Sequence, residues 1–195
     1  MRTIFSLLFL LLAFVLAFFL YKSIEEPIAF AAVRAERDGA VSSQLEMIRE
    51  AQELYRDITG EFAPRFDTLK QVLSEGQLLN IRVEGDPDDP NFTGEITYDT
   101  TFIPALQEVE RRGIILKDLD KVPFAENGES FDIDAKVIPY QSTSVPVVQV
   151  GVRKKVYMGK EFSDDRFKQY DQNYDPNSPM KFGDLNKPTL TGSWQ

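Results

Sequence analysis

The apolar run IFSLLFLLLAFVLAFFL, residues 4–20, decides the fold of this chain. Ser6 is its only polar side chain, and it contains no charged residue. Because an α-helix rises about 1.5 Å per residue, this run and one residue on either side nearly span the roughly 30 Å hydrocarbon core of a bilayer. Tyr21 and Lys22, which follow the run, are residue types suited to the interface between lipid and water. The sequence therefore predicts a transmembrane anchor over residues 1–22.

A cleaved secretory signal is the competing interpretation of this run, because the small-x-small triplet at residues 29–31 is typical of a cleavage site. The run is longer than the roughly 7 to 15 residues of a usual signal core, and charged residues and Pro27 separate it from the triplet. We therefore favour a retained anchor that contacts membrane lipid through residues 4–21.

The orientation of the anchor depends on the charges that flank it. Arg2 and the terminal amine oppose Lys22, so the positive charges close to the membrane are nearly balanced. Glu25 and Glu26 on the C-terminal flank favour an N-terminus in the cytoplasm. We expect a single-pass protein of the cell inner membrane whose C-terminal domain is periplasmic or otherwise extracytoplasmic.

Composition limits the function classes open to the rest of the chain. In a sequence of 195 residues, the part outside the anchor can form one core-bearing domain. Its 22 Lys and Arg residues against 31 Asp and Glu give a net charge of -9, which repels polyanions and argues against a nucleic-acid partner. The absence of Cys and His removes thiolate nucleophiles, the usual zinc ligands and the commonest general base. We expect no enzymatic activity, no catalytic residue, no bound metal and no cofactor.

Residues 23–60 have the composition of one long helix, which we call the stalk helix. Pro27 suits the first turn of a helix, and Gly60 suits a C-terminal stop. Gly39 costs about 1 kcal/mol relative to Ala inside a helix, which is compatible with a bend or break near it. Apolar residues recur at steps of three and four along this helix and form one stripe: Val33, Val41, Leu45, Ile48, Ala51, Leu54, Tyr55 and Ile58.

Two interpretations of this stripe remain open, since it can pack against the chain's own sheet or form a seam between subunits of an oligomer. The part before Gly39 lacks a long apolar stripe and has few residues to cover it, so it is the better candidate for contacts with neighbouring subunits. Its alternating charges over residues 34–38 fit a solvated face equally well. The residues expected to mediate interactions are Val33, Val41, Leu45, Ile48 and Tyr55, together with Trp194 near the C-terminus.

Residues 61–158 change to a period of two, which is typical of strands. Alternation predicts one strand around residues 81–83 and a second over residues 96–102. A third, at residues 131–137, follows an Asn-Gly hairpin signal, and the Val-rich residues 145–156 predict a fourth. These strands are expected to form a small antiparallel sheet within an α+β extracytoplasmic domain.

A short helix and a C-terminal arm complete the predicted elements. Residues 104–112 begin with Pro and end before Gly113, as a short helix does. Residues 159–195 are polar, but they contain more aromatic side chains than a disordered tail usually has. We expect an irregular arm that lies on its own domain or on a neighbour. The fold class is therefore α+β, with a transmembrane helix that continues into the amphipathic stalk helix and packs on a small antiparallel sheet.

Two loops are rich in oxygen ligands of the kind that Ca²⁺ prefers. Residues 86–91 carry three Asp and one Asn, and residues 171–175 alternate two Asp with one Asn. Neither loop has the Gly and Glu that an EF-hand requires at its sixth and twelfth positions, so plain acidic turns are the default interpretation. The triplet at residues 91–93 matches a glycosylation acceptor, which matters only in a suitable secretory pathway.

The segment QLEMIREAQELYRDITGEFAPRFDTLKQVL, residues 44–73, resembles the region of type IV pilins and pseudopilins where the long N-terminal helix ends against the sheet. The matching positions follow that family's order of helix end, glycine, aromatic residue and leucine: Ala51, Gln52, Tyr55, Gly60, Phe62 and Leu69. The resemblance covers roughly the first seventy residues and implies a pilin-like fold. The sequence lacks that family's basic leader ending in Gly before a Phe and its early Glu, so we expect no pilin-type processing or polymerisation.

The same segment, with the phrase KFGDLNKPTLTGSW at residues 181–194, also looks like uncharacterised single-pass envelope proteins of Bacteroidota. That resemblance implies location and architecture but no activity. The leading hypothesis is a membrane-anchored envelope protein with a structural or assembly role through protein-protein contacts, as a homo-oligomer, in a filament-like complex or with other envelope proteins. The alternatives are a tethered ligand-binding, metal-binding or carboxylate-based enzymatic domain, and a secreted pilin-like filament subunit.

Overall fold

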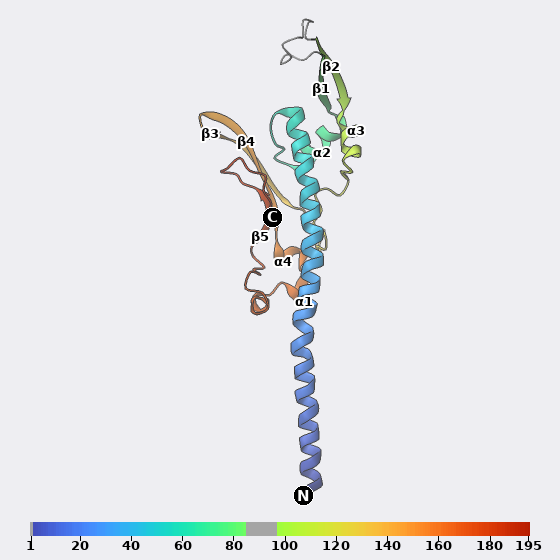
Figure 1. Ribbon diagram of the computed structural model, residues 1–195, viewed down its shortest axis with the longest axis vertical. Helices are drawn as coiled ribbons and strands as arrows, with labels where there is room; N and C mark the ends of the chain where they lie inside the picture. Colours follow the sequence, from blue (N-terminus) through green and yellow to red (C-terminus); the bar gives the residue numbers. More distant parts are fainter. Residues whose placement is uncertain (1, 85–96) are drawn as a thin grey trace, which may run out of the picture.

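One long helix, α1 (Arg2–Thr59), organises the molecule, and two small antiparallel sheets lie beside its C-terminal half (Figure 1). The computed structural model describes residues 2–84 and 97–195. The predicted α+β fold, in which the apolar segment continues into a helix packed beside small antiparallel sheets, is confirmed.

The helix α1 is unbroken at the two positions where the sequence contains helix-breaking residues. Pro27 lies in its interior, so the interpretation of Pro27 as a first-turn residue is wrong. The helix also continues through Gly39, where a bend or break was considered. Phe30 and Val41 are both buried and hold the helix on either side of Gly39. Burial of side chains of this size contributes more than the roughly 1 kcal/mol that glycine costs.

The apolar stripe of α1 lies at the centre of the core of its own chain. Its members between residues 41 and 54 have no solvent exposure: Val41, Leu45, Ile48, Ala51 and Leu54. Helix α2 (Phe66–Glu75) packs against them and buries Phe66, Leu69 and Leu73. Because the chain covers this part of the stripe itself, the self-packing interpretation describes the structure.

Two antiparallel sheets flank α1. The first is a two-stranded ribbon of β1 (Gln77–Glu84) and β2 (Thr97–Pro104), in which Leu79 lies opposite Phe102. The second sheet has the order β3-β4-β5. Its strands are β3 (Asp132–Tyr140), β4 (Thr143–Arg153) and β5 (Pro179–Gly183).

Most elements predicted from local pattern are present. The strand around residues 81–83 is β1, and the predicted short helix is α3 (Ala105–Arg111). The Val-rich strand is β4, but it ends at Arg153, where the short helix α4 (Lys154–Tyr157) begins. Ile96, the oxygen-rich loop at residues 86–91 and the glycosylation triplet lie outside the described residues.

The C-terminal segment, residues 159–195, is more regular than expected. It contains α5 (Gly159–Phe162), the 3₁₀-helix η1 (Asp165–Gln169) and β5. In β5, the buried Phe182 lies opposite Val150 of β4. The prediction of an irregular arm is therefore wrong for this strand. The strand forms by pairing with a distant segment of the chain, so its own sequence shows little alternation.

The β3-β4 hairpin projects from the side of α1 (Figure 1). On β3, Ile133 and Ala135 are half-buried as expected, but Val137 is exposed, because the hairpin extends beyond the layer that covers its base. The turn residues Gln141 and Ser142 have φ values of 46° and 69°. A two-residue hairpin turn with positive φ at both positions strongly favours glycine or asparagine, and this chain has neither there.

A fully buried glutamine holds the loop that follows α1. Gln52 has no solvent exposure, and its Nε2 atom donates to the carbonyl oxygen of Ala63 at 3.0 Å. The N–H of Ala63 donates in turn to Oε1 of Gln52 at 2.9 Å. The pair of hydrogen bonds closes the loop onto the helix and sets the position of α2. This contact gives a physical role to Gln52 in the pilin-like motif.

We expect Gln52→Ala to lower the free energy of unfolding by about 2 to 3 kcal/mol, because it leaves both main-chain groups of Ala63 buried without partners. Chemical denaturation of the full-length protein in detergent, followed by near-UV circular dichroism, measures this loss. Gln71→Ala, which removes an exposed amide from α2, should change the value by less than about 0.5 kcal/mol. Equal effects of the two substitutions would contradict the role assigned to Gln52.

A glycine in the hairpin turn should stabilise the protein. Ser142→Gly removes the cost of a left-handed backbone and should raise the free energy of unfolding by about 1 kcal/mol in the same denaturation assay. Ser144→Gly, placed in β4 just beyond the turn, should lower it instead because glycine weakens a strand. The hairpin assignment fails if Ser142→Gly is as destabilising as Ser144→Gly.

Candidate functional site: the contact between the helix and the C-terminal arm

Five aromatic side chains join α1 to the C-terminal segment. On α1 this contact lies at Phe30, ten residues beyond the end of the apolar run. Phe30 of α1 stacks on Phe167, with 5.0 Å between ring centroids, and meets Tyr174 edge-on at 4.9 Å. Phe162 and Tyr170 complete the cluster, with centroids 5.9 Å and 6.3 Å from that of Phe30. Aromatic pairs contribute about 0.5 to 1.5 kcal/mol each beyond the burial of their surface. The cluster therefore attaches the C-terminal segment firmly to the helix.

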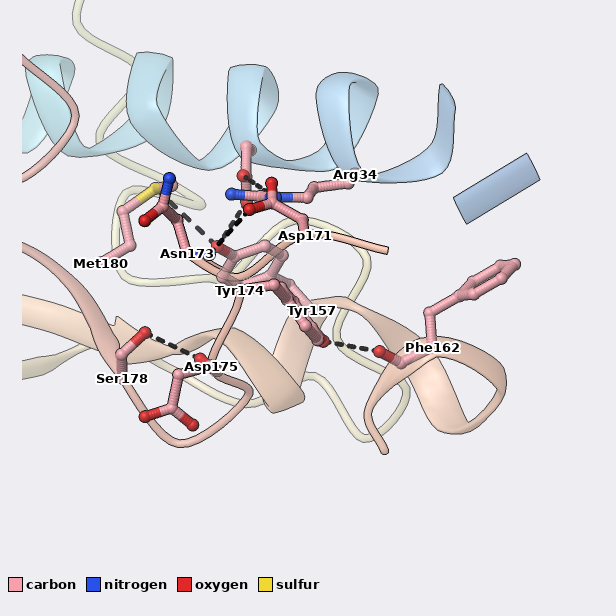
Figure 2. Close-up of polar contacts among 10 residues, drawn as sticks. Arg34, Tyr157, Phe162, Asp171, Asn173, Tyr174, Asp175, Ser178 and Met180 are labelled. Atoms are coloured by element: carbon pink, nitrogen blue, oxygen red, sulfur yellow. Dashed lines mark hydrogen bonds and ion pairs between the residues drawn. The ribbon is translucent and has the colours of Figure 1, made fainter. Parts of the chain in front are cut away.

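A polar network lies beside these rings (Figure 2). We call it the clasp, and its members are Arg34, Arg37, Asp38, Tyr157 and Asp171. Arg34 forms ion pairs with Asp38, one turn farther along α1, and with Asp171 of the C-terminal segment. Asp38 also accepts a hydrogen bond of 2.6 Å from the hydroxyl of Tyr157. Arg37 donates through Nη1 to the main-chain carbonyl of Tyr157 at 2.8 Å. The charged residues 34–38, which also fitted a solvated face, thus mostly form ion pairs or hydrogen bonds, largely with α4 and the segment that follows it.

The surroundings of Tyr157 and Tyr174 keep both hydroxyls protonated. Burial raises the pKa of Tyr157 far above its usual value near 10, and the hydrogen bond to Asp38 and the charge of that residue act in the same direction. Burial raises the pKa of Tyr174 to about 12, although the positive charge of Arg34 opposes this shift. The Tyr174 hydroxyl donates to the carbonyl oxygen of Phe162 at 2.5 Å. Both groups therefore act as structural hydrogen-bond donors.

The oxygen-rich residues 171–175 form turns. Asp171 accepts a hydrogen bond of 2.8 Å from the main-chain N–H two residues ahead, while its other carboxylate oxygen pairs with Arg34. Asp175 accepts a similar main-chain hydrogen bond of 3.1 Å and lies 3.5 Å from Nζ of Lys168. Turn formation and ion pairing therefore account for the alternation of Asp and Asn. Within residues 2–84 and 97–195, no group of three or more acidic side chains is arranged to hold a metal ion.

The residues that were expected to mediate interactions differ in how deeply they are buried. Four of them are buried in the chain's own core: Val41, Leu45, Ile48 and Tyr55. They are not available to a second copy of the folded chain. Val33 is half-buried at the edge of that core. Trp194 is half-buried too, and its indole N–H donates to Glu46 of α1 at 3.2 Å, so the end of the chain is attached to the helix.

Sequence reasoning missed the clasp as a unit. Arg34 and Asp38 stand four residues apart on a helix, and the aromatic residues of the C-terminal segment are unusually dense, so two signals were present. Neither local pattern identifies the residues with which it pairs, because Tyr157 and Asp171 are more than a hundred residues from Asp38 and Arg34 in the sequence. The pairing of the two patterns is a property of the folded chain.

A pair of large apolar side chains is exposed on the ribbon. Leu79 and Phe102 lie opposite each other in the β1-β2 register and are 53% and 65% exposed. Leu106, at the start of α3, is also exposed. The ribbon lies at the end of the molecule farthest from the N-terminus (Figure 1). We call Leu79 and Phe102 the distal pair.

Comparison with models of protein families, with curated proteins and with solved structures gave no match to this chain. Among the described residues, α1 is the one helix that is long and apolar enough to cross a membrane, and its most apolar part lies near the N-terminus. The function is therefore inferred from the chain's own residues and contacts.

Raised tyrosine pKa values predict a loss of stability at alkaline pH. Below pH 10 both tyrosines are protonated in the folded and the unfolded chain, so their contribution is fully present. Above pH 10 the unfolded chain releases these protons first, and stability falls from about pH 10 through pH 12 for Tyr174 and beyond it for Tyr157. Denaturation of full-length protein at pH 8 and pH 11 measures the loss.

Tyr157→Phe separates this effect from other alkaline titrations. It should lower the free energy of unfolding by about 1 kcal/mol at pH 8, since the hydrogen bond to Asp38 is lost. It should then lose less stability than the wild type between pH 8 and pH 11. Tyr140→Phe, in the exposed end of β3, should leave the stability at pH 8 unchanged. A Tyr157→Phe variant with the wild-type pH dependence would contradict the clasp.

Proposed function

We propose that this chain is a single-pass membrane protein of the cell envelope that acts by binding other proteins rather than by catalysis. The anchor is supported by the first part of α1, where the large apolar side chains are exposed on every side of the helix. None of the most apolar window of the helix is covered by the rest of the described chain. Lipid is the environment that removes this much apolar surface from water.

The flanking charges support the orientation that we propose. The positive charges of Arg2 and Lys22 on the two sides of the run nearly balance, so the acidic flank formed by Glu25 and Glu26 carries this argument. An N-terminus in the cytoplasm places the folded domain outside the inner membrane, in the periplasm. There the domain would meet other envelope proteins.

The observation that carries the proposed binding role is the exposure of the distal pair. The apolar stripe of α1 is covered by its own domain, so an oligomer seam along Val41 to Tyr55 is not part of this proposal. The distal pair instead offers Leu79 and Phe102 side by side on a two-stranded ribbon, whose strands each keep one edge without a strand partner in that sheet. Aromatic and aliphatic anchors of this kind carry much of the energy of protein interfaces.

The polar groups of the domain support a structural rather than a catalytic role. In the described part of the chain, no buried side-chain nitrogen or oxygen lacks a hydrogen-bond partner. Those of the clasp bind one another or the main chain, so they are used to hold the arm on α1. A neighbouring copy of the chain and a different envelope protein are both partners of the proposed kind, and the following experiment tells them apart.

A photo-crosslinking amino acid at position 102 tests the binding role in native membranes. We expect it to give defined crosslinks, which identify either a second copy or another protein by mass spectrometry. Leu79→Ser in the same chain should weaken these crosslinks by removing the natural side chain of the distal pair that remains, while changing the stability by less than about 0.5 kcal/mol. The same amino acid at position 140, on the other hairpin, serves as the control. Crosslinks no stronger from position 102 than from position 140 would refute the proposed role.

A further inference from the structure

The folded domain begins very close to the end of the apolar run. Glu26 is contacted by the C-terminal segment: Nη2 of Arg166 lies 2.8 Å from one carboxylate oxygen, and the hydroxyl of Tyr170 donates to the other at 2.7 Å. Glu26 follows Leu20, the last residue of the run, by six positions, which corresponds to about 9 Å along a helix. Helical side chains lean toward the N-terminus, so this carboxylate lies nearer to the apolar run than its own main chain does.

The distance of about 9 Å along α1 from Leu20 to Glu26 is close to the thickness of the polar layer of a membrane. A bilayer with a hydrocarbon core of about 30 Å is about 40 to 45 Å thick with its headgroups, so each headgroup layer adds roughly 5 to 8 Å. Contacts made to Glu26 therefore fall at the outer edge of that layer when the apolar run spans the core. On the basis of the anchor proposed above, we propose that residues 159–170 form a foot that rests on the headgroups of a zwitterionic phospholipid surface.

The charge of the foot fits such a surface better than an anionic one. Residues 159–170 carry three basic and three acidic side chains: Lys160, Arg166, Lys168, Glu161, Asp164 and Asp165. This segment has no net charge, whereas the whole chain carries -9. Both signs reach solvent: the side chain of Lys160 is 90% exposed although its Nζ lies 3.0 Å from a carboxylate oxygen of Glu126. A headgroup that carries one positive and one negative charge can pair with both kinds of side chain.

A hollow of about 320 Å³ lies at the same level between α1 and α5. Its lining begins at Lys22, two residues beyond the apolar run, and ends at Phe162 of the aromatic cluster. It presents one lysine together with three carboxylates, those of Glu25, Glu26 and Glu161. The foot and the first turns of α1 beyond the run thus offer charges of both signs at headgroup depth.

The foot is held rigidly to the anchor. Phe162 and Phe167 belong to it and are both buried against Phe30, which lies only four residues beyond Glu26 on α1. The foot therefore follows the helix as one body. The domain rests on the membrane surface instead of standing away from it on a bare stalk.

The absence of cysteine makes depth measurements by single-site labelling direct. The experiment uses full-length protein in phosphatidylcholine vesicles, with a fluorophore at Glu161→Cys or Gln169→Cys in the foot. Gln141→Cys, at the turn of the β3-β4 hairpin, is the matched exposed control, and Leu12→Cys reports on the anchor. Each label is tested against lipids with a nitroxide quencher on the headgroup or deep in the acyl chain.

We expect headgroup nitroxides to quench both foot labels several-fold more than the hairpin label, with little change between low and high salt. Equal quenching at the foot and the hairpin, with Leu12→Cys quenched by acyl-chain nitroxides, overturns the foot and leaves the anchor standing. A Leu12→Cys label that no lipid quenches overturns the anchor, and the foot with it. Quenching of the foot that requires anionic lipid contradicts the zwitterionic surface.

Discussion

A single unbroken helix carries two different apolar surfaces, and the rest of the structure depends on that constraint. The first part of α1 is apolar on every side, whereas the second is apolar along one stripe that the domain covers. With its first part in lipid, as we propose, the helix satisfies its main-chain hydrogen bonds internally and is already formed where it leaves the membrane. Extending the same helix to Thr59 avoids the cost of a new nucleus. The domain can then fold on a preformed surface.

The C-terminal segment returns to this helix at two places. Phe30 lies among the rings of the C-terminal segment, and Trp194 is bonded to Glu46. Between them, β5 completes the sheet through Phe182. The core around α1 therefore closes only when the last forty or so residues are present. The domain is thus attached to α1 on the side of the apolar run, while its exposed apolar side chains on the ribbon lie at the opposite end (Figure 1). That arrangement suits a protein that presents a binding surface at a set height.

Local sequence patterns predicted α1, α3 and the strands β1 to β4, but not the helices α2, α4, α5 and η1. The predicted elements show amphipathic periodicity, which depends on residues close in sequence. The stripe around Leu45 and the helix before Gly113 are examples. The continuation of the apolar helix into the stalk helix was predicted, but Pro27 was assigned to a first turn, whereas it lies inside α1. β5 and the clasp were missed for another reason. Tyr157 and its partner Asp38 each show an ordinary local pattern, and their pairing depends on contacts across more than a hundred residues.

The continuity of α1 is tested most directly by one distance. Nitroxide labels at Leu20→Cys and Glu50→Cys are both on exposed positions of the helix and are separated by thirty residues. An unbroken helix places their main-chain positions about 45 Å apart, and pulsed electron resonance on protein in lipid nanodiscs should give a narrow distribution near that value. A broad distribution, or a distance shorter by more than one helical turn, would mean that the helix breaks between the membrane and the domain.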